Sequence, residues 1–190
     1  MVRSARDFPV VRPALDQPLD KAAWRRRLRA VRREIAADEA DRAARSTRIW
    51  AGIVARAGLD GGRHAGGPAP ARIMLFDGLP TEPDTSAWFD WCAARGLATF
   101  RPEVDGPDLR VVPGDVDPAT LDVVVVPGLG FTTGGCRLGQ GGGHYDRFLS
   151  RLRPGCLTIG AAFAEQVVDD LPVEPHDAAV DVVVTDGGPP

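Results

Sequence analysis

A dense run of glycines follows an arginine and leads directly into a helical pattern. Residues 137–149 read RLGQGGGHYDRFL, with glycines at 139, 141, 142 and 143. Glycine permits positive φ values and lets a ligand approach the backbone, and free N–H groups at a helix start attract anions. Arg137 adds a guanidinium that can pair with a phosphate. The segment therefore fits a phosphate-binding loop, although an ordinary glycine-rich connection fits the same residues.

The spacing of these glycines differs from the two commonest nucleotide-binding motifs. The chain contains no Gly-Lys-Ser or Gly-Lys-Thr, so a Walker loop is excluded. A dinucleotide fingerprint belongs in the first strand–helix unit, with an acidic residue at the end of the next strand. Here the glycines come late in the chain, so their spacing alone does not name a ligand.

The surrounding elements predict an α/β fold. Residues 121–127, LDVVVVP, are a nearly all-aliphatic run, typical of a parallel strand buried on both faces. Strands alternate with helices, which predicts a single-domain three-layer sandwich with a mainly parallel sheet over residues 20–186. The glycine segment then lies beyond the carboxyl end of the most buried strand, where such sheets bind ligands. The other expected strands are 72–76, 97–100, 109–112, 156–163 and 181–185, and the expected helices are 21–35, 38–57, 85–96 and 144–152.

Apolar spacing predicts which faces of the two N-terminal helices are buried. In the first helix, Trp24, Leu28, Val31 and Ile35 form one stripe, with arginines on the other sides. The second helix is expected to begin at a capping Asp38. Its expected buried residues are Ala43, Thr47, Trp50, Val54 and Ala57.

Composition excludes several classes of protein. The chain has 190 residues and a formal net charge of −3, so no basic field argues for a nucleic-acid partner. No apolar run approaches the roughly 20 residues that span a bilayer. Three cysteines without a CxxC pair argue against a disulfide framework or a zinc site. We therefore expect a cytoplasmic protein with a small-molecule substrate, a flexible tail over residues 1–19 and a loop over 58–71. The sequence does not indicate an oligomeric state.

A longer stretch around the glycines resembles a known family. Residues 127–149, PGLGFTTGGCRLGQGGGHYDRFL, are similar to the signature of the 5-formyltetrahydrofolate cyclo-ligase family. Three further stretches agree in order: Lys21 with Arg25, the segment Glu82-Pro-Asp-Thr, and residues 162–181. The resemblance covers about residues 20–186.

The resemblance implies a reaction and two cofactors, ATP and Mg²⁺. Members of this family use MgATP to phosphorylate the formyl oxygen of 5-formyltetrahydrofolate, after which the N10 amine attacks the activated carbon. Phosphate leaves, and 5,10-methenyltetrahydrofolate and ADP are the other products. The chemistry is reasonable because phosphorylation converts a poor leaving group into a good one, so that the protein mainly positions groups and neutralises charge.

The resemblance also implies roles for individual residues. Lys21 and Arg25 would neutralise the phosphates of ATP, and Asp146 and Asp177 would hold Mg²⁺. Arg137 and Tyr145 are the expected catalytic residues. The expected nucleotide contacts are Lys21, Arg25, Arg137, Leu138, Gly139, Gln140, Gly141, Gly142, Gly143 and Tyr145. The expected substrate contacts are Asp77, Glu82, Gly141, Gly142 and His144.

Each of these residues also has an ordinary structural explanation. Lys21 and Arg25 lie among many arginines, most of which are expected on a solvated face. Asp146 could complement a helix dipole, and Asp177 could cap a loop. Glu82 could belong to a turn beside Pro83.

Three departures from the family pattern keep other functions open. His144 and Thr132 stand where the family usually has a tyrosine and an acid. The segment 102–121 is shorter than usual, which shortens one expected wall of the folate pocket. The alternatives are therefore a relative that activates a formyl or amide oxygen of a non-folate substrate, and a non-catalytic binding module. The pair Asp146 and Asp177 argues against the second alternative, because a pure binder needs no paired metal ligands.

Overall fold

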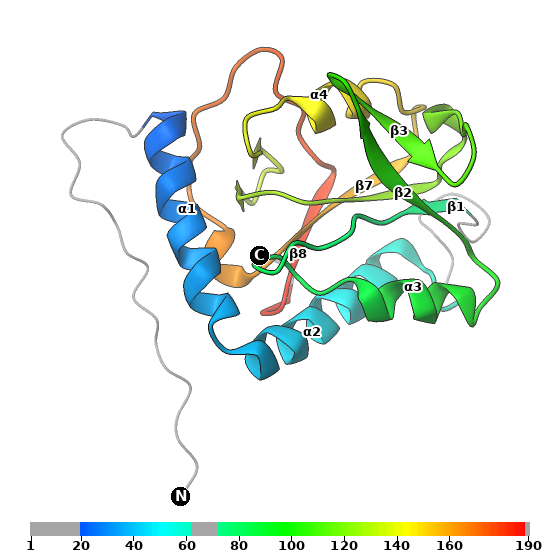
Figure 1. The fold of residues 1–190 in the computed structure, drawn as a ribbon, viewed down its shortest axis with the longest axis horizontal. Coiled ribbons are helices and arrows are strands. Elements are labelled where there is room, and N and C mark those ends of the chain that lie inside the picture. The colour runs from blue at the N-terminus through cyan, green and yellow to red at the C-terminus, as the bar shows by residue number, and fades with distance from the viewer. Residues whose placement is uncertain (1–19, 62–71, 189–190) are drawn as a thin grey trace, which may run out of the picture.

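The structure is a computed structural model that describes residues 20–61 and 72–188. The expected tail over 1–19 and residues 62–71 of the expected loop lie outside the described residues. The described chain forms a six-stranded sheet with helices on both of its faces (Figure 1).

The sheet is mainly parallel, as the sequence predicts. Its strand order is β3-β2-β1-β4-β7-β8, and every neighbouring pair is parallel except β2 and β3. The interior strand β4 buries alternate valines on opposite faces, which confirms the interpretation of the aliphatic run. The strands are β1 (Arg72–Met74), β2 (Ala98–Asp105), β3 (Asp108–Val112), β4 (Val123–Val126), β7 (Leu157–Ala162) and β8 (Val182–Thr185).

Helices complete a three-layer sandwich. Helices α2 (Glu39–Ala57) and α3 (Ser86–Ala93) cover one face, where Trp50 stacks on Trp88 with ring centroids 5.2 Å apart. Helix α4 (His144–Leu149) covers the other face through Phe148. Helix α1 (Lys21–Ala36) stands across one end of the sheet (Figure 1). Two short 3-10 helices, η1 (Pro118–Thr120) and η2 (Ala164–Gln166), lie in the connections.

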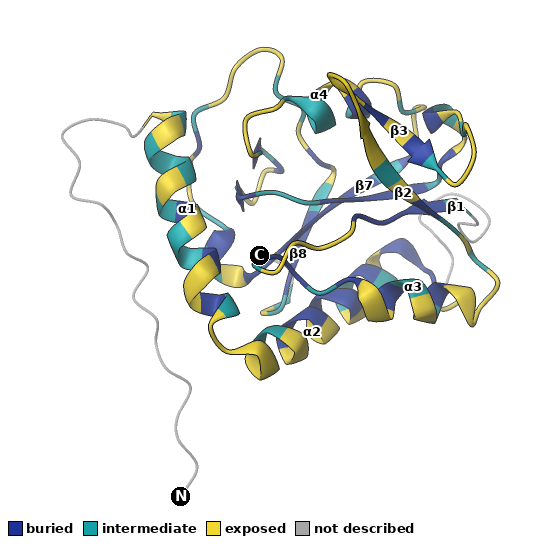
Figure 2. Ribbon diagram, viewed as in Figure 1, coloured by how far each residue is buried: buried dark blue, intermediate teal, exposed yellow. Residues whose placement is uncertain are grey.

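The predicted start of the second helix is confirmed, but its predicted buried face is only partly right: Trp50 and Ala57 are buried, and the other three residues are not. The Asp38 side chain accepts a hydrogen bond from the Asp41 N–H at 3.0 Å. Ala43 and Thr47 are exposed, and Val54 is only half-buried. Figure 2 shows buried and exposed stretches alternating along α2. The face is rotated because α2 buries an arginine, Arg45, whose charge is balanced by carboxylates. The buried residues are Arg45, Ser46, Ile49, Trp50, Ile53 and Ala57.

Helix α1 shows a similar departure. Leu28 and Ile35 are buried as expected, whereas Trp24 and Val31 are only half-buried. Arg32, expected among solvated arginines, has only 2% of its surface exposed. A periodicity that counts arginine as polar therefore misses part of the buried face.

Several other details of the elements also differ from the prediction. Strand β2 continues past Pro102 to Asp105. Beyond Phe100 it pairs with β3 and no longer with β1, so the N–H that Pro102 lacks is not needed for a hydrogen bond to β1. A small antiparallel pair, β5 (Gly130–Phe131) and β6 (Arg137–Leu138), stands between β4 and the glycines. Helix α4 ends at Leu149 instead of continuing to residue 152.

Candidate active site

A cavity of about 460 Å³ lies beyond the carboxyl ends of β1 and β4. Helix α1, the hairpin of β2 and β3, the glycine segment and the loop before β8 all contribute to its lining. Every residue that the sequence singled out for the site lines this cavity, which is the position that the fold class predicts. Those residues are Lys21, Arg25, Asp77, Glu82, Arg137, Leu138, Gly139, Gln140, Gly141, Gly142, Gly143, His144, Tyr145, Asp146 and Asp177.

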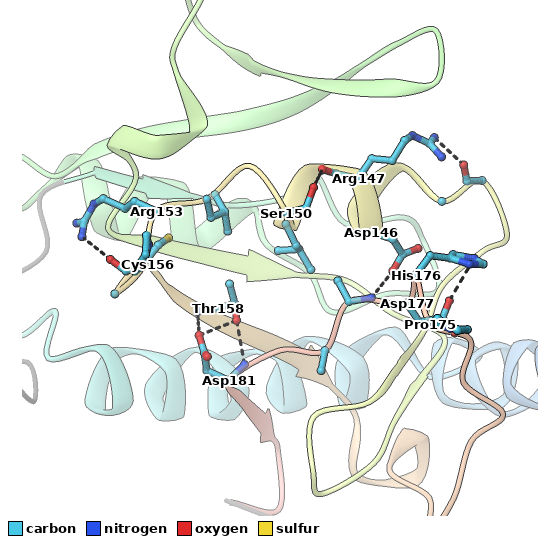
Figure 3. A pocket seen from close by; sticks show the side chains of 18 of the residues that line it. Asp146, Arg147, Ser150, Arg153, Cys156, Thr158, Pro175, His176, Asp177 and Asp181 are labelled. Carbon is cyan, nitrogen blue, oxygen red and sulfur yellow. Dashed lines mark hydrogen bonds and ion pairs between the residues drawn. The ribbon is translucent and has the colours of Figure 1, made fainter.

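A second, more open cavity of about 1080 Å³ lies along α4 (Figure 3). Its lining includes Ser150, Cys156 and the hydrogen-bonded pair of Thr158 and Asp181. The two cavities share Asp146, Asp177 and the glycines at 141–143. The start of α4 is therefore accessible from both cavities.

The glycine segment has the backbone geometry that its composition implies. Gly141 and Gly143 have φ values of +111° and +67°, in the left-handed region that favours glycine. A Cβ atom on Gly142 would meet the His144 ring at 2.6 Å. Because α4 has only six residues, its dipole adds little, and side chains supply most of the positive charge here.

Helix α1 holds the glycine segment from the side. Arg25 donates a hydrogen bond through Nε to the Gly139 carbonyl at 3.1 Å. Arg29 donates to the carbonyl and to the side-chain oxygen of Gln140, at 3.3 and 3.0 Å. The terminal nitrogens of Arg25 are not needed for its contact with the loop. Sequence reasoning assigned no role to Arg29, because nothing in the helix distinguishes it from its neighbouring arginines.

Arg137 and Asp146 form a largely buried ion pair. Arg137 Nη2 lies 2.7 Å from Asp146 Oδ1, which also accepts a hydrogen bond from the Ala178 N–H at 3.1 Å. Arg137 Nε is buried and has no hydrogen-bond partner within the described part of the chain. The neighbouring Tyr145 hydroxyl is in the same situation, and burial raises the pKa of Tyr145. Tyr145 therefore remains a neutral hydroxyl, able to donate to a ligand.

Lys21 contacts two carboxylates of the loop before β8. Its Nζ lies 2.7 Å from Asp177 Oδ2 and also contacts Glu174. Burial alone would lower the pKa of Lys21, but hydrogen bonds and charge from these carboxylates outweigh burial and raise it. Burial would raise the pKa of Asp177, yet the contact with Lys21 and a backbone N–H lower it. The neighbouring His176 is mainly exposed.

The remaining predicted contacts lie in varied environments. Glu82 is buried and pairs with Arg32 at 3.0 Å, whereas Asp77 is exposed and pairs with Arg101 at 2.9 Å. His144 Nε2 lies 3.4 Å from the Gly106 carbonyl in the turn between β2 and β3. The Leu138 side chain packs in a core cluster with residues of α1, so the cavity has little access to it.

Sequence reasoning missed the apolar part of the lining. Phe76 and Leu79 come from the segment after β1, Val104 comes from β2 and Leu109 comes from β3. Leu79 and Val104 are 51% and 63% exposed, so they offer apolar surface that the described protein does not cover. Scattered over 34 positions, these residues form no motif, and only the fold brings them together.

Thr132 lies away from both cavities. Its hydroxyl accepts a hydrogen bond from the Cys136 N–H at 3.1 Å and stabilises the turn between β5 and β6. The missing acid at this position therefore changes the turn, not the lining of the cavity.

The fold and the cavity define an α/β protein whose cleft combines a glycine segment with several cations. The chain belongs to the 5-formyltetrahydrofolate cyclo-ligase family, whose model matches residues 81–186. It is 41% identical over 75 residues to 5-formyltetrahydrofolate cyclo-ligase of Mus musculus, covering 36% of each chain. It is 42% identical over 91 residues to the protein of that name in Escherichia coli K12, covering 47% of this chain and 49% of the relative.

A solved structure supports the fold. The structure of a 5,10-methenyltetrahydrofolate synthetase from Mycoplasma pneumoniae matches with a TM-score of 0.75 and 24% identity. That match covers 88% of this chain and 99% of the other, so the likeness extends well beyond the glycine segment. In contrast, the sequence matches cover between 28% and 49% of the length of the curated relatives. Within residues 20–61 and 72–188, no helix combines the length and apolar character that a membrane crossing requires.

Proposed function

We propose that the protein is an MgATP-dependent cyclo-ligase that converts 5-formyltetrahydrofolate to 5,10-methenyltetrahydrofolate, ADP and phosphate. The observation that supports this most is that a single cavity is lined by three cations, by two side chains with a buried donor that has no partner among the described residues, and by a buried carboxylate. Membership of the family adds independent support.

The phosphate end of the site would lie between α1 and the glycine segment. Lys21 and Arg25 approach the segment from α1, and Arg137 stands at its start. Hydrogen bonds from α1 to the carbonyls of Gly139 and Gln140 fix the segment, which lowers the cost of ordering it around a ligand. Cations at this position would neutralise the charge of a transferring phosphoryl group, the main requirement of that reaction.

The reacting oxygen would lie near Tyr145 and Arg137. Arg137 Nε and the Tyr145 hydroxyl are buried donors without partners in the described chain, and leaving such a donor unpaired typically costs about 1–3 kcal/mol. A formyl oxygen would recover this cost by accepting from them once the two side chains turn toward the cavity, since neither donor atom exposes surface to it in this structure. The same donors would stabilise negative charge on that oxygen while it is phosphorylated and while phosphate leaves after attack by N10.

The folate ring would bind at Glu82 and the apolar lining. A carboxylate pairs with the amino and ring N–H groups along one edge of a pterin. Phe76 and Leu109 offer apolar contacts to a flat ring, and the exposed Val104 extends this surface outward. The cavity volume of about 460 Å³ lies within the range usual for small-molecule sites.

Asp146 and Asp177 would hold the magnesium ion. The hydrogen bond from the Ala178 N–H to Asp146 Oδ1 places the Asp146 carboxylate beside the residue that follows Asp177. The other oxygen, Asp146 Oδ2, accepts no hydrogen bond from the described residues. Mg²⁺ favours such a site, with one or two carboxylates completed by phosphate oxygens and water. When bound, it would neutralise phosphate charge. Asp177 would then exchange its contact with Lys21 for the metal.

The direct test mixes the purified protein with MgATP and 5-formyltetrahydrofolate and follows the near-ultraviolet absorbance of the methenyl product. We expect a Mg²⁺-dependent rise that Asp146→Asn abolishes. Asp90→Asn, which removes an exposed carboxylate of α3 outside the cavity, is the matched control and should keep full activity. Full activity of Asp146→Asn would contradict the metal assignment, and no rise with the wild type would contradict the proposed reaction.

One observation favours a second candidate, a relative that activates a formyl or amide oxygen on a smaller, non-folate compound. Strands β2 and β3 are joined by a tight turn at Gly106 and Pro107, and Val104 beside it is 63% exposed. This side of the cavity is therefore open. ADP release with a small formamide, without turnover of 5-formyltetrahydrofolate, would support this candidate.

A further inference from the structure

Arg32 is a buried cation that the proposed reaction does not use. It lies on the inner face of α1 and has 2% of its surface exposed. We propose that Arg32 is a positioning residue that keeps Glu82 ionised and oriented, so that the cavity selects ligands with an edge of N–H donors. This inference rests on the proposed function and identifies what controls substrate choice at its folate end.

The contacts of Arg32 use all sides of its guanidinium. Nη1 donates to Glu82 Oε1 at 3.0 Å, Nε donates to the Thr81 carbonyl at 3.1 Å, and Nη2 donates to the Thr81 hydroxyl at 2.7 Å. The other carboxylate oxygen of Glu82 accepts from the Leu79 N–H at 3.0 Å. Each carboxylate oxygen thus has one protein partner and retains capacity to accept from a ligand.

Burial makes this pairing necessary for the charge of Glu82. A buried carboxylate without a counterion takes up a proton, because a low-dielectric environment disfavours its charged form. The Arg32 and Glu82 side chains are only 3% and 7% exposed, so solvent screens neither of them. Burial also lowers the pKa of Arg32, with the charge of Glu82 opposing this effect. Arg32 remains charged because its ordinary pKa is very high.

An ionised Glu82 offers the cavity only hydrogen-bond acceptors at this position. A carboxylate only accepts hydrogen bonds, whereas a protonated carboxyl also donates one. A ligand edge with adjacent amino and ring N–H groups satisfies the carboxylate, and an edge that replaces the amino group by a methyl group leaves an acceptor unpaired. Sites that hydrogen-bond a polar group strongly reject analogues that lack it.

Other charged groups near Glu82 do not replace Arg32. Arg42, from α2, donates to the Glu82 main-chain carbonyl at 3.1 Å. Tyr145, from α4, is neutral, and the carboxylate of Asp77 is exposed and paired with Arg101. Arg29 is near enough to lower the pKa of Arg32, but its own hydrogen bonds go to Gln140. Arg32 is thus the described cation that pairs with this carboxylate.

The test measures the affinity for 5-formyltetrahydrofolate without ATP, by calorimetry, between pH 6 and pH 8.5. Arg32→Met removes the charge and keeps much of the apolar volume, and Arg32→Lys restores a charge. Arg45→Met is the matched control, because Arg45 is also a buried arginine paired with carboxylates, Glu165 and Asp186, but it does not line the cavity. The two histidines of the lining are unchanged in every variant, so their effect cancels when variant and wild type are compared.

We expect Arg32→Met to lose about tenfold more affinity than the wild type as the pH falls from 8.5 to 6, because a buried carboxylate that has lost its counterion takes up a proton more readily. Arg32→Lys should restore most of the wild-type profile. The double variant Arg32→Met with Glu82→Gln should bind weakly, without this added pH dependence. The preference for 5-formyltetrahydrofolate over the analogue that carries a methyl group in place of the 2-amino group should fall in Arg32→Met at pH 6.

Each alternative result has a definite meaning. If Arg32→Met follows the wild-type pH profile, as Arg45→Met should, Arg32 has only a structural role and the inference is wrong. If the wild type binds no 5-formyltetrahydrofolate at any pH, both the inference and the proposed function are wrong. A wild type that binds the folate and forms the methenyl product, with a pH-independent Arg32→Met, would contradict the inference alone.

Discussion

Replacement of Gly141 by alanine would separate the role of the glycine segment from its effect on stability. Gly141 has a φ of +111°, which an L-residue adopts only with strain, and its Cβ would stand 3.5 Å from the guanidinium carbon of Arg25. The added atom fits, so backbone strain of roughly 1–2 kcal/mol is the main cost. The segment can relieve this strain by rotating toward negative φ, and the rotation would displace the carbonyls that Arg25 and Arg29 hold.

The matched control for this change is Gly114→Ala. Gly114 also has a positive φ, +83°, its Cβ would meet no atom within 4 Å, and it lies outside both cavities. Both variants should lose similar stability, and each kcal/mol lowers the midpoint of thermal unfolding by about 2–4 °C in a chain of this size. Only Gly141→Ala should also lose function, by about a hundredfold in kcat/KM, the usual effect of displacing a positioned group by about 1 Å.

Thermal unfolding and the methenyl absorbance assay, performed on the same preparations, measure the two effects separately. Equal melting temperatures and a large difference in kcat/KM are the expected result. If Gly141→Ala keeps the activity of Gly114→Ala, the geometry of the segment is not needed for the reaction, and the argument from the glycines is refuted.

Three further predictions concern charge, packing and thiol reactivity. Lys21→Met should lower the free energy of unfolding, measured with urea, by about 1 kcal/mol at neutral pH. Because Lys21 lowers the pKa of Asp177, this difference from the wild type should shrink as the pH falls below the ordinary aspartate value of 3.8. A constant difference down to pH 2 would contradict the pairing. Gly160→Ala should lose about 1–3 kcal/mol by the same measurement, because its Cβ would stand 2.5 Å from the Phe131 ring, and wild-type stability would rule out this contact. Burial raises the pKa of Cys156 to about 12, so iodoacetamide at pH 8 should not modify this thiol in the native protein, as measured by mass spectrometry. Rapid modification would show that the thiol is accessible.

The layout of the sheet could be predicted because its strongest signal is local. The valines of β4 are buried on both faces, and only a central parallel strand fits four consecutive aliphatic residues followed by proline and glycine. The cap at Asp38 is also local, since one carboxylate and one N–H three residues later define it. Such features need no knowledge of distant partners.

The buried arginines could not be predicted for the opposite reason. Arg45 is buried because Glu165 and Asp186, more than 100 positions away, surround it. Arg32 is buried because Thr81 and Glu82 accept its hydrogen bonds. Helical periodicity assigns arginine to the solvent, so each of these residues shifts the inferred face of its helix.

The residues that the sequence assigned to the site all line one cavity in the structure. Its polar residues were found through their resemblance to a family motif, which carries information from many sequences that physical reasoning on one chain lacks. The apolar lining at Phe76, Val104 and Leu109 has no such motif, and only the hairpin of β2 and β3 shows its position. Roles of individual residues stay predictions that the proposed variants test.

The contacts of α1 have a consequence for how the protein is made. Arg25 and Gly139 are 114 positions apart, and Lys21 and Asp177 are 156 positions apart. During synthesis the helix emerges early, but its cations meet their partners only after the loop before β8 has followed. Such distant contacts form late, because the entropy of closing a long loop opposes them until other packing is in place. A nascent chain would therefore complete the lining of this cavity only after the loop before β8 has been synthesised.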